Sequence, residues 1–225
     1  MRRCLLCDQI LQHEPTFGQL FAKTQPDFCL SCWQGFECIQ REERCQRCCG
    51  LVKKTESICE QCRYWEKQYG WIPEHHALFA YNEGAKQVLH QIKFLGDIAL
   101  IDGFVEPTNE YFRKNMNKKL ITGIPSATER LKVRKIDVIK HFCDQLDYAF
   151  DSFLVKLLHT PHQSEQSKTE RLKLVYPFQV CQTVPKKLLL IDDVYTTGAT
   201  LYQAIHALEQ AGMAKNKIQT FSLFR

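Results

Sequence analysis

One stretch, residues 188–200, constrains the fold more than any other part of the chain. It reads Leu-Leu-Leu-Ile-Asp-Asp-Val-Tyr-Thr-Thr-Gly-Ala-Thr: a short apolar strand that ends in two carboxylates, then a loop of small and hydroxyl residues. Leu201, Ile205 and Leu208 follow at helical spacing, which predicts an amphipathic helix directly after the loop. This order indicates an α/β fold, in which ligands bind at the carboxyl ends of the strands.

The residues of this stretch suit a ligand that carries both a phosphate and a sugar diol. The Thr-Thr-Gly-Ala-Thr turn offers backbone N–H groups and a helix N-terminus to a phosphate. Asp192 and Asp193 can accept hydrogen bonds from ribose hydroxyls or hold a hydrated magnesium ion. The alternative, a strand whose acidic end only caps the next helix, does not account for so particular a pattern.

The stretch resembles the phosphoribosyl-pyrophosphate (PRPP) motif of type I phosphoribosyltransferases, and all thirteen of its positions are compatible with that motif. The resemblance implies a doubly wound parallel sheet and a site for PRPP with magnesium. It indicates binding and does not by itself indicate a reaction, so no catalytic residue is assigned. The residues that it places at PRPP are Asp192, Asp193, Tyr195, Thr196, Thr197, Gly198, Ala199 and Thr200.

The length and the cysteine distribution predict two domains. A chain of 225 residues suits one sizeable α/β domain with a small appendage. Ten of the twelve cysteines lie in residues 4–62, so we expect a cysteine-rich head over residues 1–70 and a phosphoribosyltransferase-like domain over 71–225. Parallel strands are predicted at Leu120–Ile124, Leu188–Ile191 and Lys217–Leu223. No run has the length of a membrane span and the first residues lack a signal-peptide core, so a cytoplasmic location is expected.

Four Cys-x-x-Cys pairs predict that the head binds zinc. Each pair places two thiolates on one side of a tight turn, and two pairs complete a tetrahedral S4 site. In a reducing cytoplasm this pattern indicates metal more than disulfides, and redox catalysis is the weaker alternative because the head lacks a βαβ context. The simplest assignment, two structural zinc ions held by sequential pairs, gives one site from Cys4, Cys7, Cys29 and Cys32 and the other from Cys45, Cys48, Cys59 and Cys62.

Spacing alone leaves one further arrangement open, a cross-braced one that joins the first pair with the third and the second with the fourth. Two head cysteines remain outside the pairs. We expect Cys38 to be buried, and Cys49 to be a neighbour of the metal without being a ligand.

Bound zinc would change the net charge of the chain, and with it the class of partner that the charge favours. The formal net charge of +5 counts every thiol as neutral, whereas eight thiolates with two Zn²⁺ ions leave about +1. Residues 1–75 hold 10 Lys/Arg and 10 Asp/Glu, so the metallated head is acidic by about four charges. Such a head has little electrostatic reason to bind nucleic acid, and its predicted role is a structural clip that docks other elements.

Positive charge gathers in residues 113–140, where a predicted strand and turn precede a basic segment. Only Glu129 and Asp137 oppose nine cations there: Arg113, Lys114, Lys118, Lys119, Arg130, Lys132, Arg134, Lys135 and Lys140. In phosphoribosyltransferases the equivalent loop meets pyrophosphate, so the resemblance places pyrophosphate or DNA phosphates at Pro125, Ser126, Arg130 and Arg134. A solvated basic face is the better interpretation of Lys118, Lys119 and Lys140; a groove for single-stranded nucleic acid remains a third interpretation.

Two further features receive no firm role. The polar segment 163–171 suits either a loop that closes over a bound anion or a plain surface loop. The eight histidines show no spacing typical of ligands or catalysis.

The order of parts resembles the ComF/ComFC family of late competence proteins. The parts are the cysteine pairs, Tyr81-Asn82-Glu83 leading to Lys93-Phe94-Leu95-Gly96-Asp97, a proline loop with arginines, Gln163-Ser164 with Lys168-Thr169-Glu170-Arg171, and the PRPP motif. The resemblance implies a zinc head before a phosphoribosyltransferase-like domain, and a role in natural transformation that handles incoming single-stranded DNA. It implies as partners the competence DNA-translocating ATPase, through which the protein would reach the membrane DNA-uptake complex, and a recombination mediator. Two alternatives stay open: an active phosphoribosyltransferase of unknown acceptor, and a zinc scaffold with a vestigial nucleotide site.

One segment departs from the family pattern. Where the family usually reads Arg-Gly-Phe-Asn-Gln, this chain reads Arg134-Lys135-Ile136-Asp137-Val138. The change removes the backbone freedom of glycine and the hydrogen bonding of two amides, which argues against a catalytic role for the segment.

Overall fold

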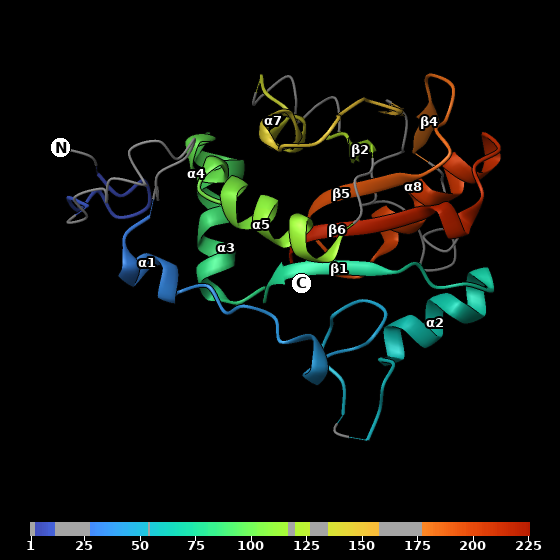
Figure 1. The fold of residues 1–225 in the computed structure, drawn as a ribbon, viewed down its shortest axis with the longest axis horizontal. Coiled ribbons are helices and arrows are strands. Elements are labelled where there is room, and N and C mark those ends of the chain that lie inside the picture. The colour runs from blue at the N-terminus through green and yellow to red at the C-terminus, as the bar shows by residue number, and fades with distance from the viewer. Residues whose placement is uncertain (1–2, 12–27, 54, 117–119, 127–134, 158–176) are drawn as a thin grey trace, which may run out of the picture.

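The fold is built on a parallel sheet of four strands in the order β1-β6-β5-β2 (Figure 1). The computed structural model describes residues 3–11, 28–53, 55–116, 120–126, 135–157 and 177–225. The two inner strands are apolar along most of their length because a parallel sheet is covered on both faces. The strands are β1 (His75–Phe79), β2 (Leu120–Gly123), β5 (Leu188–Val194) and β6 (Ile218–Phe224).

The three predicted strands are confirmed as β2, β5 and β6, with no end displaced by more than three residues. β5 runs to Val194, so both Asp192 and Asp193 belong to the strand itself. Edge strand β1 was not predicted, because its first two residues are the histidines His75 and His76. The structure buries both of them.

Helices cover both faces of the sheet, since successive residues of a strand point to opposite faces. Leu189 and Ile191 of β5 pack in one apolar cluster with four helices, whereas Leu188 and Leu190 pack in a second cluster with the helix after the PRPP-like motif. The predicted α/β class with a parallel sheet is therefore confirmed. The first layer holds α3 (Glu83–His90), α4 (Ala99–Asp102), α5 (Val105–Asn115) and α7 (Val138–Gln145), and the second holds α8 (Ala199–Gln210).

The cysteine-rich head runs along the β1 edge of the sheet, drawn in blue to cyan in Figure 1. Its backbone pairs with this edge, where Ile39 donates to Leu78 at 3.0 Å and Ala80 donates to Glu37 at 2.8 Å. The head thus covers an edge strand that would otherwise expose unpaired backbone groups. Its regular elements are α1 (Leu30–Gln34), the 3₁₀ turn η2 (Arg41–Glu43) and α2 (Glu60–Tyr69).

The remaining elements lie around the ends of the sheet. A π-helical turn, η3, continues α3, and a two-stranded antiparallel ribbon, β3 with β4, lies outside the main sheet. Along the described ranges, no helix is both long and apolar enough to span a lipid bilayer. The bounds are η3 (Gln91–Leu95), β3 (Leu154–Lys156), β4 (Phe178–Val180) and the 3₁₀ turn η4 (Lys215–Lys217).

Candidate functional site

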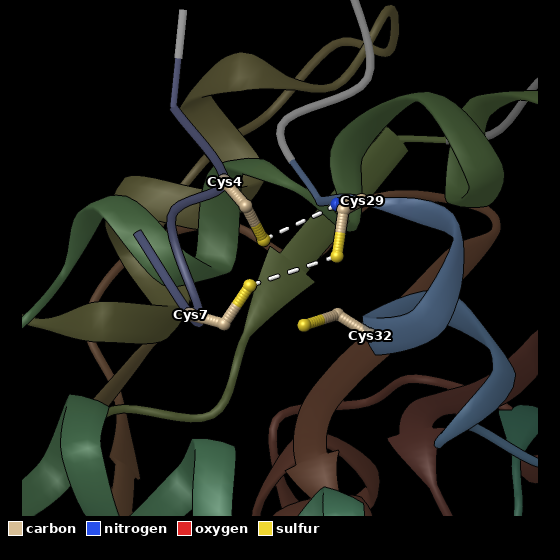
Figure 2. A group of neighbouring side chains, drawn as sticks. All are labelled: Cys4, Cys7, Cys29 and Cys32. Atoms are coloured by element: carbon tan, nitrogen blue, oxygen red, sulfur yellow. Dashed lines mark hydrogen bonds between the residues drawn. The ribbon is translucent and has the colours of Figure 1, made fainter. Parts of the chain in front are cut away.

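The structure brings the cysteine pairs together in sequential order, so the cross-braced arrangement is wrong. Figure 2 shows the first tetrad, whose four sulfurs point toward one another. A tetrahedral zinc site with Zn–S bonds of about 2.3 Å separates its sulfurs by roughly 3.8 Å. The sulfurs of Cys45 and Cys62 are 3.8 Å apart and those of Cys48 and Cys59 are 3.5 Å apart, so the donor set fits zinc. Within each group the four sulfurs lie within 4.8 Å: Cys4, Cys7, Cys29 and Cys32 form the first tetrad, and Cys45, Cys48, Cys59 and Cys62 the second.

The first half of each tetrad is the same turn. An Arg-Cys-x-x-Cys segment closes with a backbone hydrogen bond of 2.8 Å, from Cys4 in the first tetrad and from Cys45 in the second. The residue after the second cysteine takes a left-handed backbone, with φ of 60° at Asp8 and 58° at Cys49. The two turns thus share one geometry.

The second half of each tetrad is the start of a helix. Cys29 precedes α1 and Cys59 precedes α2, and the backbone N–H of each donates to the sulfur of the first cysteine of its tetrad, at 3.2 Å and 3.4 Å. Free N–H groups at a helix N-terminus favour the thiolate form that a metal needs. Hydrogen bonds from Ser31 and from the Cys32 backbone lower the pKa of the Cys29 thiol to about 6.

The two remaining head cysteines differ from each other. Cys49 lies buried outside both tetrads and donates to the carbonyl of His75 at 3.4 Å, as expected of a neighbour of the metal. Cys38 is exposed, so the expectation that it is buried was wrong. Its backbone bridges to Phe79 at the sheet edge, and the side chain that enters the core from this segment is Phe36.

The acid pair, Asp192 and Asp193, lies near the carboxyl end of β5. The Asp193 carboxylate forms an ion pair with Lys93, and the Asp193 N–H donates to Asp192 Oδ1 at 2.9 Å. Burial and the neighbouring Asp193 charge raise the pKa of Asp192 to about 7. A cation bound here would hold Asp192 in its charged form, as a magnesium site requires.

Lys93 is a site residue to which sequence reasoning gave no role. It lies on the π-helical turn η3, and such turns occur frequently at functional sites. The sequence carried one signal, the Lys93–Asp97 segment that supports the family resemblance, but nothing in its spacing shows that the ammonium reaches Asp193.

The loop between β5 and α8, residues 195–198, carries the residues predicted to bind a phosphate and is called the phosphate loop below. Tyr195 is buried, whereas Thr196 and Thr197 are exposed. Gly198 is the N-cap of α8 with φ of 82°, and a Cβ there would lie 2.6 Å from Tyr195 Cζ, so only glycine fits. The Ala199 N–H donates to Thr197 Oγ1 at 3.4 Å, which places the threonine hydroxyl over the first turn of the helix.

The second predicted anion loop lies at the same edge of the sheet. β2 pairs with β5, and the Ile124 N–H donates to Ile191 O at 2.8 Å, so Pro125 and Ser126 follow β2 beside the acid pair. The Ser126 N–H donates to Asp137 Oδ2 at 3.0 Å. The other predicted residues of this loop, Arg130 and Arg134, lie outside the described residues.

Several cations of the basic segment are already paired. Arg113 binds Glu106 at 2.7 Å, Lys114 lies 4.0 Å from Glu110, and Lys140 binds Asp144 at 2.6 Å. These pairs agree with a solvated face for Lys140 and reduce the net positive field of α5 and α7. Of the other six, Lys135 is described and exposed; outside the described residues are Lys118, Lys119, Arg130, Lys132 and Arg134.

A cleft of about 560 Å³ adjoins the phosphate loop on the side of the head. Ion-paired Arg44 and Glu37 line one side of it, 2.6 Å apart. The rest of its lining consists of Gly50, Leu51, Ala80, Tyr81, Asn82, Tyr195, Thr196 and Arg225.

Comparison with known proteins identifies the family. No protein-family model matches the chain. The chain is 34% identical over 227 residues to the competence protein ComFC of Streptococcus pneumoniae, covering 99% of this chain and 100% of that protein. It is 29% identical over 230 residues to the competence protein ComFC of Bacillus subtilis, covering 99% of this chain and 94% of that protein. The chain belongs to the ComF/ComFC family.

Proposed function

We propose that the protein is a competence factor that handles single-stranded DNA during natural transformation and carries a magnesium-dependent site for a PRPP-type phosphosugar. The competence role is supported by the two relatives named competence proteins, which match this chain over nearly its whole length. The DNA-translocating ATPase and a recombination mediator are the proposed partners.

The observation that carries the phosphosugar site is the acid pair beside the phosphate loop at the carboxyl edge of the sheet. Exposed Thr196 and Thr197 and the N-terminus of α8 suit the 5′-phosphate, while Asp192 and Asp193 suit the ribose diol and a magnesium ion. Magnesium would neutralise charge on the diphosphate. Because Lys93 already pairs with Asp193, a ligand that engages this carboxylate must share it with the ammonium or displace it.

We place DNA or pyrophosphate contacts at the loop after β2 and its basic continuation, namely Pro125, Ser126, Arg130 and Arg134. The reasons are its position beside the acid pair and the ion pairs that occupy the cations of α5 and α7. Lys135 is exposed and lies two positions before Asp137, whose carboxylate accepts from the Ser126 N–H, so we add it to the proposed contact residues.

The test is a titration of single-stranded DNA by fluorescence anisotropy at one fixed salt concentration, with and without Mg²⁺–PRPP. We expect DNA to bind and PRPP to shift its affinity, since linked sites influence each other reciprocally. Asp193→Asn should abolish PRPP binding, while Asp144→Asn, an exposed control on α7, should not change it. Retained PRPP affinity in Asp193→Asn would contradict the site, and absence of DNA binding would contradict the DNA role. Release of pyrophosphate in the same mixture would identify a transferase instead.

A further inference from the structure

Two side chains that the proposed function does not use, Trp65 of the head and Arg225 after β6, connect the second tetrad to the phosphate loop. Arg225 follows β6, and its backbone N–H donates to Phe79 O at 2.9 Å. Its guanidinium lies between the second tetrad and the phosphate loop. Trp65 lies on α2, the helix that begins at the second tetrad.

Arg225 binds both sides of this junction. Toward the tetrad it donates from Nε to the Cys48 carbonyl at 3.0 Å and from Nη2 to the Cys48 sulfur at 3.2 Å. Toward the loop, Nη1 donates to the carbonyls of Tyr195 and Thr196 at 3.4 Å and 3.3 Å. A Cβ on Gly50 would lie 2.8 Å from the Arg225 Cζ, so the turn of the second tetrad packs directly on the guanidinium.

Trp65 holds the next carbonyl of the same loop. Its indole Nε1 donates to Thr197 O at 2.7 Å. Its ring stacks on Tyr202 of α8, with centroids 4.4 Å apart, so the contact is fixed by packing as well as by the hydrogen bond. Three successive loop carbonyls, those of residues 195, 196 and 197, therefore accept hydrogen bonds from groups that the second tetrad positions.

Fixing these carbonyls also fixes the N–H groups that bind a phosphate. In a planar trans peptide the C=O of one residue and the N–H of the next point in opposite directions. The bound carbonyls thus direct the N–H groups of Thr196, Thr197 and Gly198 away from the head, and among the described residues no group accepts from them. Donors held in place before binding cost less to order when the anion arrives.

We propose that Arg225 and Trp65 are positioning residues through which the second tetrad pre-organises the phosphate loop, so that zinc at this tetrad and a phosphorylated ligand at the loop bind cooperatively. The first tetrad takes no part. Its buried Cys4 packs in the apolar cluster of α3, α4 and α5, whereas the second tetrad shares its cluster with Tyr195 and Leu201. The inference rests on the proposed phosphosugar site.

The first measurement is ligand affinity by calorimetry on the zinc-loaded full chain, with Mg²⁺–PRPP and separately with inorganic phosphate. Trp65→Phe keeps the ring stack and removes one hydrogen bond, so the Kd should rise roughly three- to tenfold. Arg225→Gln loses both loop contacts, and its Kd should rise about tenfold or more. The control is Arg63→Gln, which removes the exposed α2 ion pair with Glu56 and should change the Kd by less than about twofold. Wild-type affinity in Trp65→Phe would overturn the proposal.

The second measurement separates positioning from mere stability. A coloured chelator follows zinc release with and without Mg²⁺–PRPP, and Cys7→Ser identifies which kinetic phase belongs to the first tetrad. We expect the ligand to slow release from the second tetrad several-fold in the wild type and to have no such effect in Arg225→Gln or Trp65→Phe, because coupling is reciprocal. Equal slowing of both phases, or undiminished slowing in the variants, overturns the inference. If phosphate binds but PRPP does not, the proposed function fails and phosphate replaces PRPP in this measurement; if neither binds, both proposals fail.

Discussion

Asp192 shows, at the scale of one residue, that a side chain suited to binding a ligand can lower the stability of the folded chain. Burial and the Asp193 charge raise its pKa from 3.8 to about 7, so between these values the folded chain holds a proton that the unfolded chain has lost. The free energy of unfolding must therefore fall as the pH rises through this window. The site keeps a carboxylate whose charged form a bound cation would stabilise further, a frequent property of functional residues.

Replacing this carboxylate should stabilise the protein only where it would be charged. We expect Asp192→Asn to raise the free energy of unfolding by roughly 1 to 3 kcal/mol at pH 8 and to change it little at pH 4. Urea unfolding at the two pH values measures the difference. Asp144→Asn, whose carboxylate is exposed, provides the control. A gain of equal size at both pH values would contradict the assigned cause.

Lys135 is a second residue that lowers the free energy of unfolding, in this case through its backbone conformation. It takes φ of 62°, in the left-handed region, at the position where the family usually has glycine. A residue with a side chain adopts this conformation at a free-energy cost that glycine avoids.

Lys135→Gly should therefore stabilise the protein by about 0.5 to 1 kcal/mol, because glycine adopts the left-handed backbone without strain. Part of the gain is lost because glycine also gives the unfolded chain more conformational freedom. Thermal unfolding measures the net gain. The same substitution at Lys114, in the last turn of α5, should lose about 1 kcal/mol, since there glycine only loosens a helix. If Lys135→Gly instead destabilises the protein, the contacts of the lysine side chain stabilise the fold by more than its left-handed backbone destabilises it.

At the scale of elements, sequence patterns predicted the features that depend on residues close together in the chain. The apolar run before Asp192 gave β5, the spacing of Leu201, Ile205 and Leu208 gave α8, and the cysteine pairs gave both tetrads. The contacts that complete the site are long-range: Trp65 donates to a residue 132 positions away and Arg225 to one 177 positions away. No periodicity or motif carries information of this kind, which only the packing of α2 and β6 supplies.

Helix α7 provides the test at this scale, because Asp137 links it to the loop after β2. One carboxylate oxygen accepts from Ile139 and Lys140 at the helix start, and the other accepts from Ser126. Asp137→Ala should cost about 1 to 2 kcal/mol of unfolding free energy and release the Ser126 turn.

Chemical denaturation measures this loss, and pyrophosphate titration measures the effect on the turn. Asp144→Ala removes only an exposed ion pair of the same helix and should cost about 0.5 kcal/mol or less. Equal costs for the two variants would show that Asp137 does not cap α7.

At the scale of the whole molecule, the two tetrads serve different halves of one core. Cys4 of the first tetrad packs with Phe28, Phe36 and Phe104 on one side of the sheet, and the second tetrad packs with α8 and Tyr195 on the other. A structural zinc site contributes roughly 10 to 16 kcal/mol of folding free energy in model peptides. Since head and sheet share both clusters, this free energy must reach the sheet as well as the head.

Zinc removal should accordingly destabilise the entire protein in one transition. With a strong chelator present, we expect the melting temperatures reported by head and sheet to fall together, because each tetrad anchors side chains of the sheet's own core. Tryptophan fluorescence follows the head and its junction with the sheet, where Trp33, Trp65 and Trp71 lie, and circular dichroism follows the helices and strands. If chelation removes the head signal while the sheet melts at its original temperature, the head is an independent module. The shared clusters would then contribute little to the stability of the sheet.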